Sequence, residues 1–140
     1  MTLTPEQAAP LIDQMVEKWN KFSDEQKNTW KQKFGELMGS PDAMKAAEEE
    51  GMATFKASDT NGNGKLNRAE FIDHSKKEEA NYEAKGWPGF GYTDEEHGQV
   101  YDALAAAMGA DADGLTAEQL KSVEEVIMGP FCEKIGMDMS

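Results

Sequence analysis

The chain has 140 residues, of which 39% are hydrophobic, which is enough to form one folded domain with a buried core. Its formal net charge of −13 repels nucleic acid and anionic membrane surfaces, so neither is expected as a partner, and no apolar run reaches membrane-spanning length. The single Cys132 cannot form an internal disulfide, and the first residues lack a signal-peptide pattern, so we expect a cytoplasmic protein.

Marked helix starts recur along the chain and predict an all-α protein. In four segments a Ser or Thr is followed three residues later by Glu or Gln, the capping-box pattern in which both side chains satisfy free backbone N–H groups. These segments are Thr4 to Gln7, Ser23 to Gln26, Thr93 to Glu96 and Thr116 to Gln119. Ser40 before Pro41 adds a fifth start. Strand signals are nearly absent.

The first half of the chain divides into two units. Residues 1–39 predict an N-terminal helical hairpin whose apolar stripes include Trp19 and Trp30. Residues 40–85 predict a third helix toward Ser58, a polar loop and a fourth helix. A two-helix hairpin cannot bury its apolar faces alone, so we expect it to pack against the rest of the chain.

The second half begins with a linker, residues 86–92, which is rich in Gly and aromatic residues and which we expect to be packed. Residues 93–140 predict a fifth helix, a short loop, a sixth helix and a tail. Gly129-Pro130 is expected to stop the sixth helix, because Pro disrupts a helix interior. The four parts together predict one compact domain.

The loop at residues 59–70 has oxygen-bearing side chains at its first, third, fifth, ninth and last positions. Ca²⁺ binds six to eight oxygens and tolerates irregular geometry. Gly64 stands where the chain must turn with a positive φ, Lys65 can offer its backbone carbonyl, and Glu70 can offer two carboxylate oxygens. The predicted metal ligands are Asp59, Asn61, Asn63, Lys65, Asn67 and Glu70.

This loop, the following Phe71 and the predicted flanking helices closely resemble the EF-hand family of calcium-binding proteins. The resemblance implies a helix-loop-helix unit with Ca²⁺ as its cofactor. Because only Asp59 and Glu70 are anionic, we expect a dissociation constant on the order of 10⁻⁶ to 10⁻⁴ M. The alternative is an Asn- and Gly-rich turn whose Glu70 only caps the next helix.

EF-hands occur in pairs, and residues 109–120 resemble a second, degenerate unit. Leu115 aligns with Leu66, which predicts a short backbone bridge between the two loops. Gln119 stands where the bidentate Glu is required, and Gly109 stands at the leading Asp position, so this loop is expected to have lost its ion. The alternative is weak binding through the carboxylates of Asp111, Asp113 and Glu118.

The histidines, the cysteine and the methionines give weaker indications of function. His74 and His97 are isolated from other metal ligands, so we expect both on the surface. Cys132 is expected to be a small buried residue, with a reactive thiol as the alternative. The nine Met residues are either core or, as on adaptable binding surfaces, the lining of a groove.

The resulting expectation is an all-α protein, an EF-hand pair preceded by a helical hairpin. Its function is calcium sensing, in which one ion at residues 59–70 rearranges the helices and a protein or peptide target helix reads the change. The alternatives are a cytosolic calcium buffer and a calcium-stabilised structural or adaptor protein. We do not expect an enzyme, because no catalytic triad order, phosphate-binding loop or hydrolase metal spacing occurs.

Overall fold

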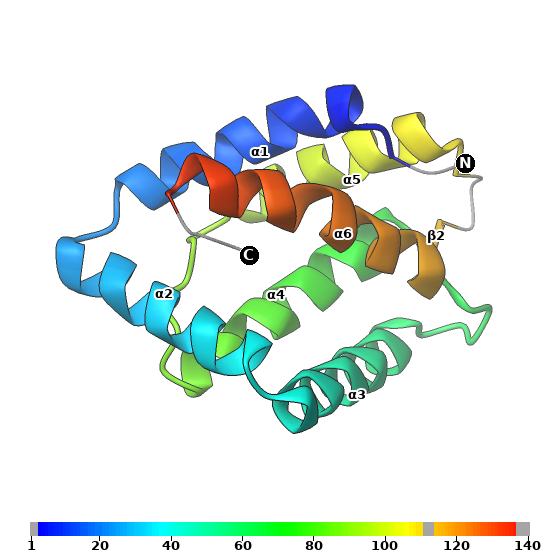
Figure 1. Cartoon of the computed structure of the whole chain (residues 1–140). Coiled ribbons are helices and arrows are strands. Elements are labelled where there is room, and N and C mark those ends of the chain that lie inside the picture. Colours follow the sequence, from blue (N-terminus) through cyan, green and yellow to red (C-terminus); the bar gives the residue numbers. More distant parts are fainter. Residues whose placement is uncertain (1–2, 111–113, 137–140) are drawn as a thin grey trace.

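The computed structural model describes residues 3–110 and 114–136 and shows a mostly helical protein (Figure 1). Within these residues the helices are α1 (Pro5–Asn20), α2 (Asp24–Met38), α3 (Pro41–Ser58), α4 (Arg68–Ala84), α5 (Asp94–Met108) and α6 (Ala117–Lys134). Two short strands, β1 (Lys65–Leu66) and β2 (Leu115–Thr116), form the sheet of this described part. The all-α prediction is confirmed. None of the described helices has the length and apolar character needed to cross a membrane.

All four predicted capping boxes form. At the start of α1, for example, the Gln7 N–H donates to Thr4 Oγ1 at 3.2 Å, and the Thr4 N–H donates to Gln7 Oε1 at 3.0 Å. The boxes at α2, α5 and α6 have the same reciprocal pairs, and Ser40 caps α3. Short polar side chains therefore fix where most of the helices begin.

The first two helices do not form the predicted hairpin. They diverge from the turn that joins them: α1 packs along α6, and α2 packs against α3 (Figure 1). Trp19 and Trp30 meet edge-on near this turn, with ring centroids 5.4 Å apart, and both rings also contact Phe131 of α6. The apolar stripes of the two helices are thus buried by different partners. The stripe on a helix shows that the helix has a buried face, but not which other helix covers it.

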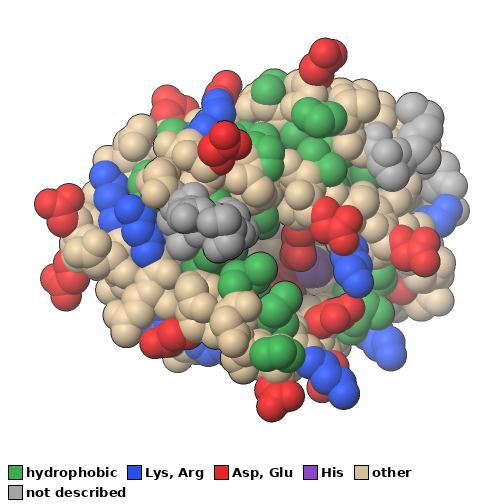
Figure 2. All heavy atoms as spheres, viewed as in Figure 1, with side chains coloured by type: hydrophobic (Ala, Val, Ile, Leu, Met, Phe, Trp, Pro, Cys, Tyr) green, Lys and Arg blue, Asp and Glu red, His purple; other side chains and the backbone are tan. Residues whose placement is uncertain are grey.

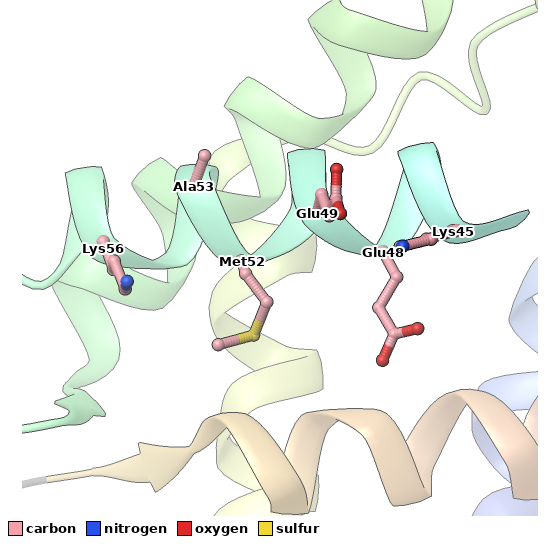
Figure 3. Close-up of a pocket in the computed structure, with 6 residues that line it drawn as sticks. All are labelled: Lys45, Glu48, Glu49, Met52, Ala53 and Lys56. Atoms are coloured by element: carbon pink, nitrogen blue, oxygen red, sulfur yellow. The ribbon is translucent and has the colours of Figure 1, made fainter. Parts of the chain in front are cut away.

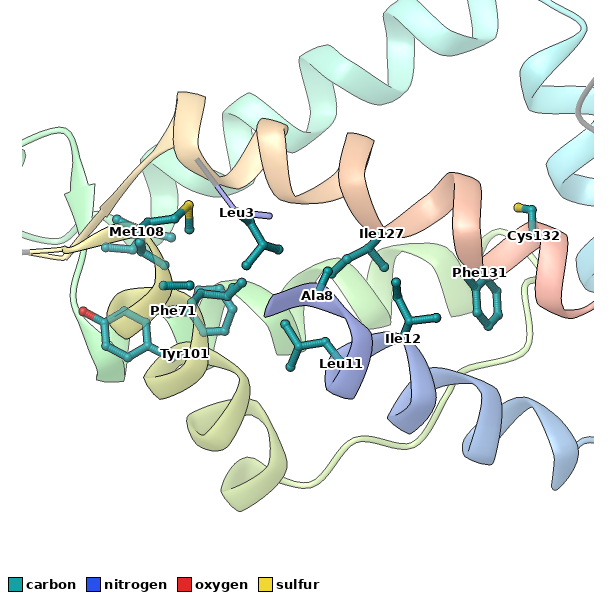
Figure 4. Packing of buried hydrophobic residues seen from close by; sticks show 14 of the residues in the cluster. Leu3, Ala8, Leu11, Ile12, Phe71, Tyr101, Met108, Ile127, Phe131 and Cys132 are labelled. Carbon is teal, nitrogen blue, oxygen red and sulfur yellow. The ribbon is translucent and has the colours of Figure 1, made fainter. Parts of the chain in front are cut away.

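The main core lies where α1 covers α4, α5 and α6. Ala8, Leu11 and Ile12 of α1 are buried and lie close to Ile127 and Phe131 of α6 (Figure 4). Leu3, ahead of the helix, is also buried, which the sequence pattern had not indicated. The expectation that the N-terminal region packs on the rest of the chain is confirmed for α1.

Helix α6 does not stop at Gly129-Pro130. It continues through Pro130 to Lys134, although a Pro in a helix interior lacks one N–H and crowds the preceding turn, at a cost of about 3 kcal/mol. Phe131 and Cys132, the next two residues, are fully buried. Their burial offsets the loss, because both side chains reach the core only if the helix continues.

The two histidines are less exposed than predicted. His97 on α5 is only 7% exposed, so its expected place on the surface is wrong, and His74 on α4 is half-buried with its ring edge-on to Phe55. The buried position of Cys132 and the packed linker are confirmed. In that linker Trp87 contacts Trp30, and Phe90 contacts Phe22.

The predicted bridge between the two loops is confirmed by β1 and β2. They pair antiparallel, with Leu66 opposite Leu115, and both leucines have no exposed surface. Gly114 precedes β2 with φ +113°, and a Cβ on it would overlap the carbonyl group of Leu66. Only glycine allows this conformation and this close approach together.

Replacing Gly114 with Ala is therefore expected to lower the free energy of unfolding by about 2–4 kcal/mol, through backbone strain and the displaced strand pair. Gly129→Ala is the matched control. It lies in α6 with no atom close to an added Cβ, so Ala there should be neutral or stabilising by up to about 1 kcal/mol. Urea unfolding of both variants measures the difference, and equal midpoints would contradict the role given to Gly114.

Candidate functional site

The candidate site is the loop between α3 and α4. Asp59 ends α3, and its carboxylate turns back over the loop: Oδ2 accepts from the Gly64 N–H at 2.8 Å, and Oδ1 accepts from the Asn63 N–H at 3.3 Å. Asn61 Oδ1 faces the same Asn63 N–H at 3.4 Å. The first and third side chains of the loop therefore point their oxygens at one interior point.

The middle of the loop turns as the sequence indicated. Gly64 has φ +78°, the left-handed conformation expected at this position. Asn63 Oδ1 accepts from the N–H of Lys65 at 3.0 Å, which fixes the peptide that leads into β1. Asn67 begins α4 as its N-cap, and its Oδ1 accepts from the Glu70 N–H at 2.9 Å.

Glu70 closes the loop on its first residues. It is only 7% exposed, and its Oε2 accepts from both the N–H and the hydroxyl of Thr60, at 2.9 and 2.8 Å. Its Oε1 accepts from the Asn67 N–H at 3.0 Å and so completes a capping box. Sequence reasoning did not single out Thr60, because a Thr at the second position of such a loop carries no recognisable signal.

Glu70 is held in its ionised form. The N–H of Asn67 is the largest cause that lowers the pKa of this carboxyl, and the hydroxyl and N–H of Thr60 lower it as well, while burial opposes them. A carboxylate that accepts several N–H and O–H donors keeps its charge. The loop thus has a buried anion at its end and an anionic Asp59 at its start.

The oxygen donors of this loop fit a hard cation such as Ca²⁺. Asp59, Asn61 and Glu70 have side-chain oxygens that converge on the backbone N–H groups inside the loop, and none offers nitrogen or sulfur ligation of the kind zinc selects. Asn67 instead uses its side-chain oxygen as a helix cap. Among the described residues, no three His, Cys, Asp or Glu side chains cluster at metal-binding distance, so amide and carbonyl oxygens would have to supply much of the set.

The second loop has a matching end. Gln119 Oε1 accepts from the Thr116 N–H at 2.8 Å, and the Gln119 N–H donates to Thr116 Oγ1 at 3.1 Å, the same capping box that Glu70 forms with Asn67. The position that aligns with the carboxylate therefore has an uncharged amide in the same local geometry. Asp111 and Asp113, two of the three carboxylates proposed for weak binding there, lie outside the described residues.

No family model, curated protein or solved structure matches this chain.

A second polar region lies between α3, α4 and α6. Figure 2 shows a hollow on this face with acidic and histidine side chains in its depth. Glu78 of α4 has a buried Oε1 with no hydrogen-bond partner in the described part of the chain. The pKa of Glu78 is raised from 4.5 to about 7, mainly by burial and in smaller part by the carboxylates of Glu124 and Glu50, while Lys85 opposes them.

Glu78 should therefore make the protein less stable as the pH rises. Its folded-state pKa of about 7 lies above the unfolded value of 4.5, so the folded chain binds more protons in between, and stability falls from pH 4.5 toward pH 7. Glu78→Gln, which resembles the protonated side chain, should be more stable than the parent at pH 8 and equally stable near pH 5.

Urea unfolding from pH 5 to pH 8 measures this difference. Glu49→Gln on α3 is the control, since it removes the same charge from an exposed position. A stabilisation by Glu78→Gln that is equal at both ends of the pH range would contradict the assignment.

Proposed function

We propose that residues 59–70 bind one Ca²⁺ and that the protein is a calcium sensor. The observation that carries this proposal is the closure of the loop by Glu70 on Thr60, which brings the last candidate ligand to the residue that follows the first. Asp59, Asn61, Asn63, Glu70 and the carbonyl of Lys65 would hold the ion, with Asn67 beside it through a bridging water. Bound Ca²⁺ would supply a fixed double positive charge that draws these oxygens together.

In this proposal α3 to α6 form an EF-hand pair in which only the first loop binds an ion. The pairing of Leu66 with Leu115 supports it, because the two loops lie side by side and each stands between two helices. Gln119 supports the loss of the second site, because an amide offers one oxygen and no charge.

Glu70 is the residue through which the ion would act on the fold. It lies in the first turn of α4, and the next residue, Phe71, is buried against Tyr101 of α5 with ring centroids 5.5 Å apart. Turning the carboxylate from Thr60 toward an ion would move the start of α4 and the ring that follows it. Because α4 also packs on α3, this movement changes how α3 and α5 are spaced.

The face between α3 and α6 is the surface to which a target helix would bind after the helices have moved. A hollow of about 490 Å³ lies along α3, and Met52 and Glu48 point across it toward α6 (Figure 3). Met38, Met44 and Met52 are 41–46% exposed, which is high for Met in a core. Adaptable Met side chains beside carboxylates suit an amphipathic helix that carries basic residues.

A passive buffer or a calcium-stabilised scaffold is the second candidate. One observation favours it: both oxygens of Glu70 are already satisfied by the loop and the helix cap, so ion binding could leave α4 in place. Lys121 of α6 also bonds Glu48 of α3 at 3.2 Å across the hollow, which opposes opening, although an exposed pair of this kind contributes little.

Calorimetric titration with Ca²⁺ tests the site. The parent should bind one ion per chain, and Glu70→Gln should bind at least about 100-fold more weakly, because it loses one of two anionic ligands and the bidentate pair. Gln119 already forms the same capping box in α6, so Gln at position 70 should keep the helix cap and the fold. This substitution therefore separates an ion ligand from a mere cap.

Glu118→Gln is the matched control in the second loop, and it should titrate like the parent. Two comparable sites in the parent would contradict the single-site assignment. If Glu70→Gln bound the ion as tightly as the parent, residues 59–70 would not be the site.

Apolar-dye fluorescence separates a sensor from a buffer. For a sensor we expect Ca²⁺, and not an equal concentration of Mg²⁺, to raise the dye signal of the parent, because helix movement exposes more of the apolar surface around the Met side chains along α3. Glu70→Gln should give no rise. An unchanged signal in a parent that binds Ca²⁺ by calorimetry would favour the buffer or scaffold.

A further inference from the structure

A cavity of about 220 Å³ lies between α1, α4, α5 and α6, on the other side of the core from the hollow along α3. Most of its wall is apolar: Leu11, Phe71 and Ile127, which Figure 4 labels, line it together with Met15 and Val100. Ser75, Tyr92 and His97 add polar atoms to the same wall. A dry cavity of about 150 Å³ is large enough to bind benzene in another protein, so this one has room for a small ring.

His97 has an unsatisfied group at this cavity. The residue is 7% exposed, and its Nε2 is buried with no hydrogen-bond partner in the described part of the chain. Glu79 Oε2 is 3.8 Å from Nε2, which is too long for a hydrogen bond. A buried polar atom without a partner destabilises a fold unless a ligand or water satisfies it.

The imidazole is also fixed in place. Its ring stacks on Tyr92 with centroids 5.4 Å apart, and the Lys18 ammonium lies over the Tyr92 ring at 4.7 Å. Lys18 in turn pairs with Glu96 at 2.9 Å, which ties α1 to α5 beside the cavity. Burial is the main cause that lowers the pKa of His97, so its ring is uncharged at neutral pH. An anionic ligand would therefore find no positive charge at Nε2.

We infer that this cavity is a binding site for a small uncharged molecule, an apolar ring or short chain that carries one hydroxyl group, with the hydroxyl on His97 Nε2. A hydroxyl suits this position because it can both donate and accept, and a neutral imidazole nitrogen does one or the other according to its tautomer. The volume limits the ligand to about seven non-hydrogen atoms, at about 30 Å³ for a water-sized group with its free space. The inference does not depend on the calcium site.

Phenol and toluene test the inference, because both have the same ring and the same number of non-hydrogen atoms and only phenol has a hydroxyl. The full chain, kept in a chelator, is titrated with each probe and followed by NMR. Phenol should bind about three- to tenfold more tightly than toluene, the gain of one hydrogen bond to a buried partner. It should also shift the ring-proton signal of His97 and leave that of His74 unchanged.

Two variants complete the test. His97→Phe keeps an aromatic ring against Tyr92 but removes the nitrogen, so phenol and toluene should then bind equally. His74→Phe is the matched control on α4, which should keep the parent's preference and also assigns the two histidine signals, since the chain has only two. If the His97→Phe variant does not fold, two measurements on the parent still test the inference. They are the ratio of its affinities for phenol and toluene and the shift of its His97 signal.

The inference is wrong if phenol binds no more tightly than toluene, if it leaves the His97 signal in place, or if neither probe binds up to its solubility. It is also wrong if a folded His97→Phe variant keeps the preference for phenol, because the hydroxyl would then bind elsewhere.

Discussion

The backbone pairing of Leu66 with Leu115 is the contact on which the two halves of the fold depend, because it joins the loop after α3 to the loop after α5. Both leucines are completely buried, so the bridge is also part of the core and not an exposed ribbon. Gly114 allows the strands to approach so closely. A change in the first loop therefore has a direct route to the second loop through two residues of strand.

Glu70 has two roles, and each uses one of its two carboxylate oxygens. As the third residue of α4 it caps the helix through Asn67, and through Thr60 it closes the loop. A calcium ion would take over the second of these contacts more easily than the first, because the Thr60 bonds hold the loop whereas the Asn67 bond satisfies an N–H that the helix leaves free. Thr60 would thus compete with the proposed ion for Oε2, and the free energy of its two hydrogen bonds would set part of the affinity.

Local features of the sequence predict local structure well here. The Ser and Thr caps, the positive φ of Gly64 and the bridge at Leu66 each follow from a few neighbouring residues. The convergence of Asp59 and Asn61 oxygens also follows from their spacing in the loop. Whether these oxygens hold an ion is a question of affinity, which spacing does not decide.

Features that depend on distant partners could not be predicted in the same way. Pro130 signals a helix end, but burial of Phe131 and Cys132 extends α6 beyond it. Trp19 and Trp30 indicate two apolar stripes and not which helix buries each. His97 has polar neighbours in the sequence, and its burial comes from tertiary packing, since its ring stacks on Tyr92 and α4 packs against α5. In each case tertiary contacts outweigh a local preference of a few kcal/mol.

The order of residues along α4 connects the two proposed sites. Glu70 faces the loop, and Phe71, the next residue, lines the cavity beside His97. A shift of Glu70 toward an ion moves the Phe71 ring, so the ion and a cavity ligand would act on the same turn of helix. Linkage then requires reciprocity: whatever factor the ion imposes on the affinity for the ligand, the ligand imposes on the affinity for the ion.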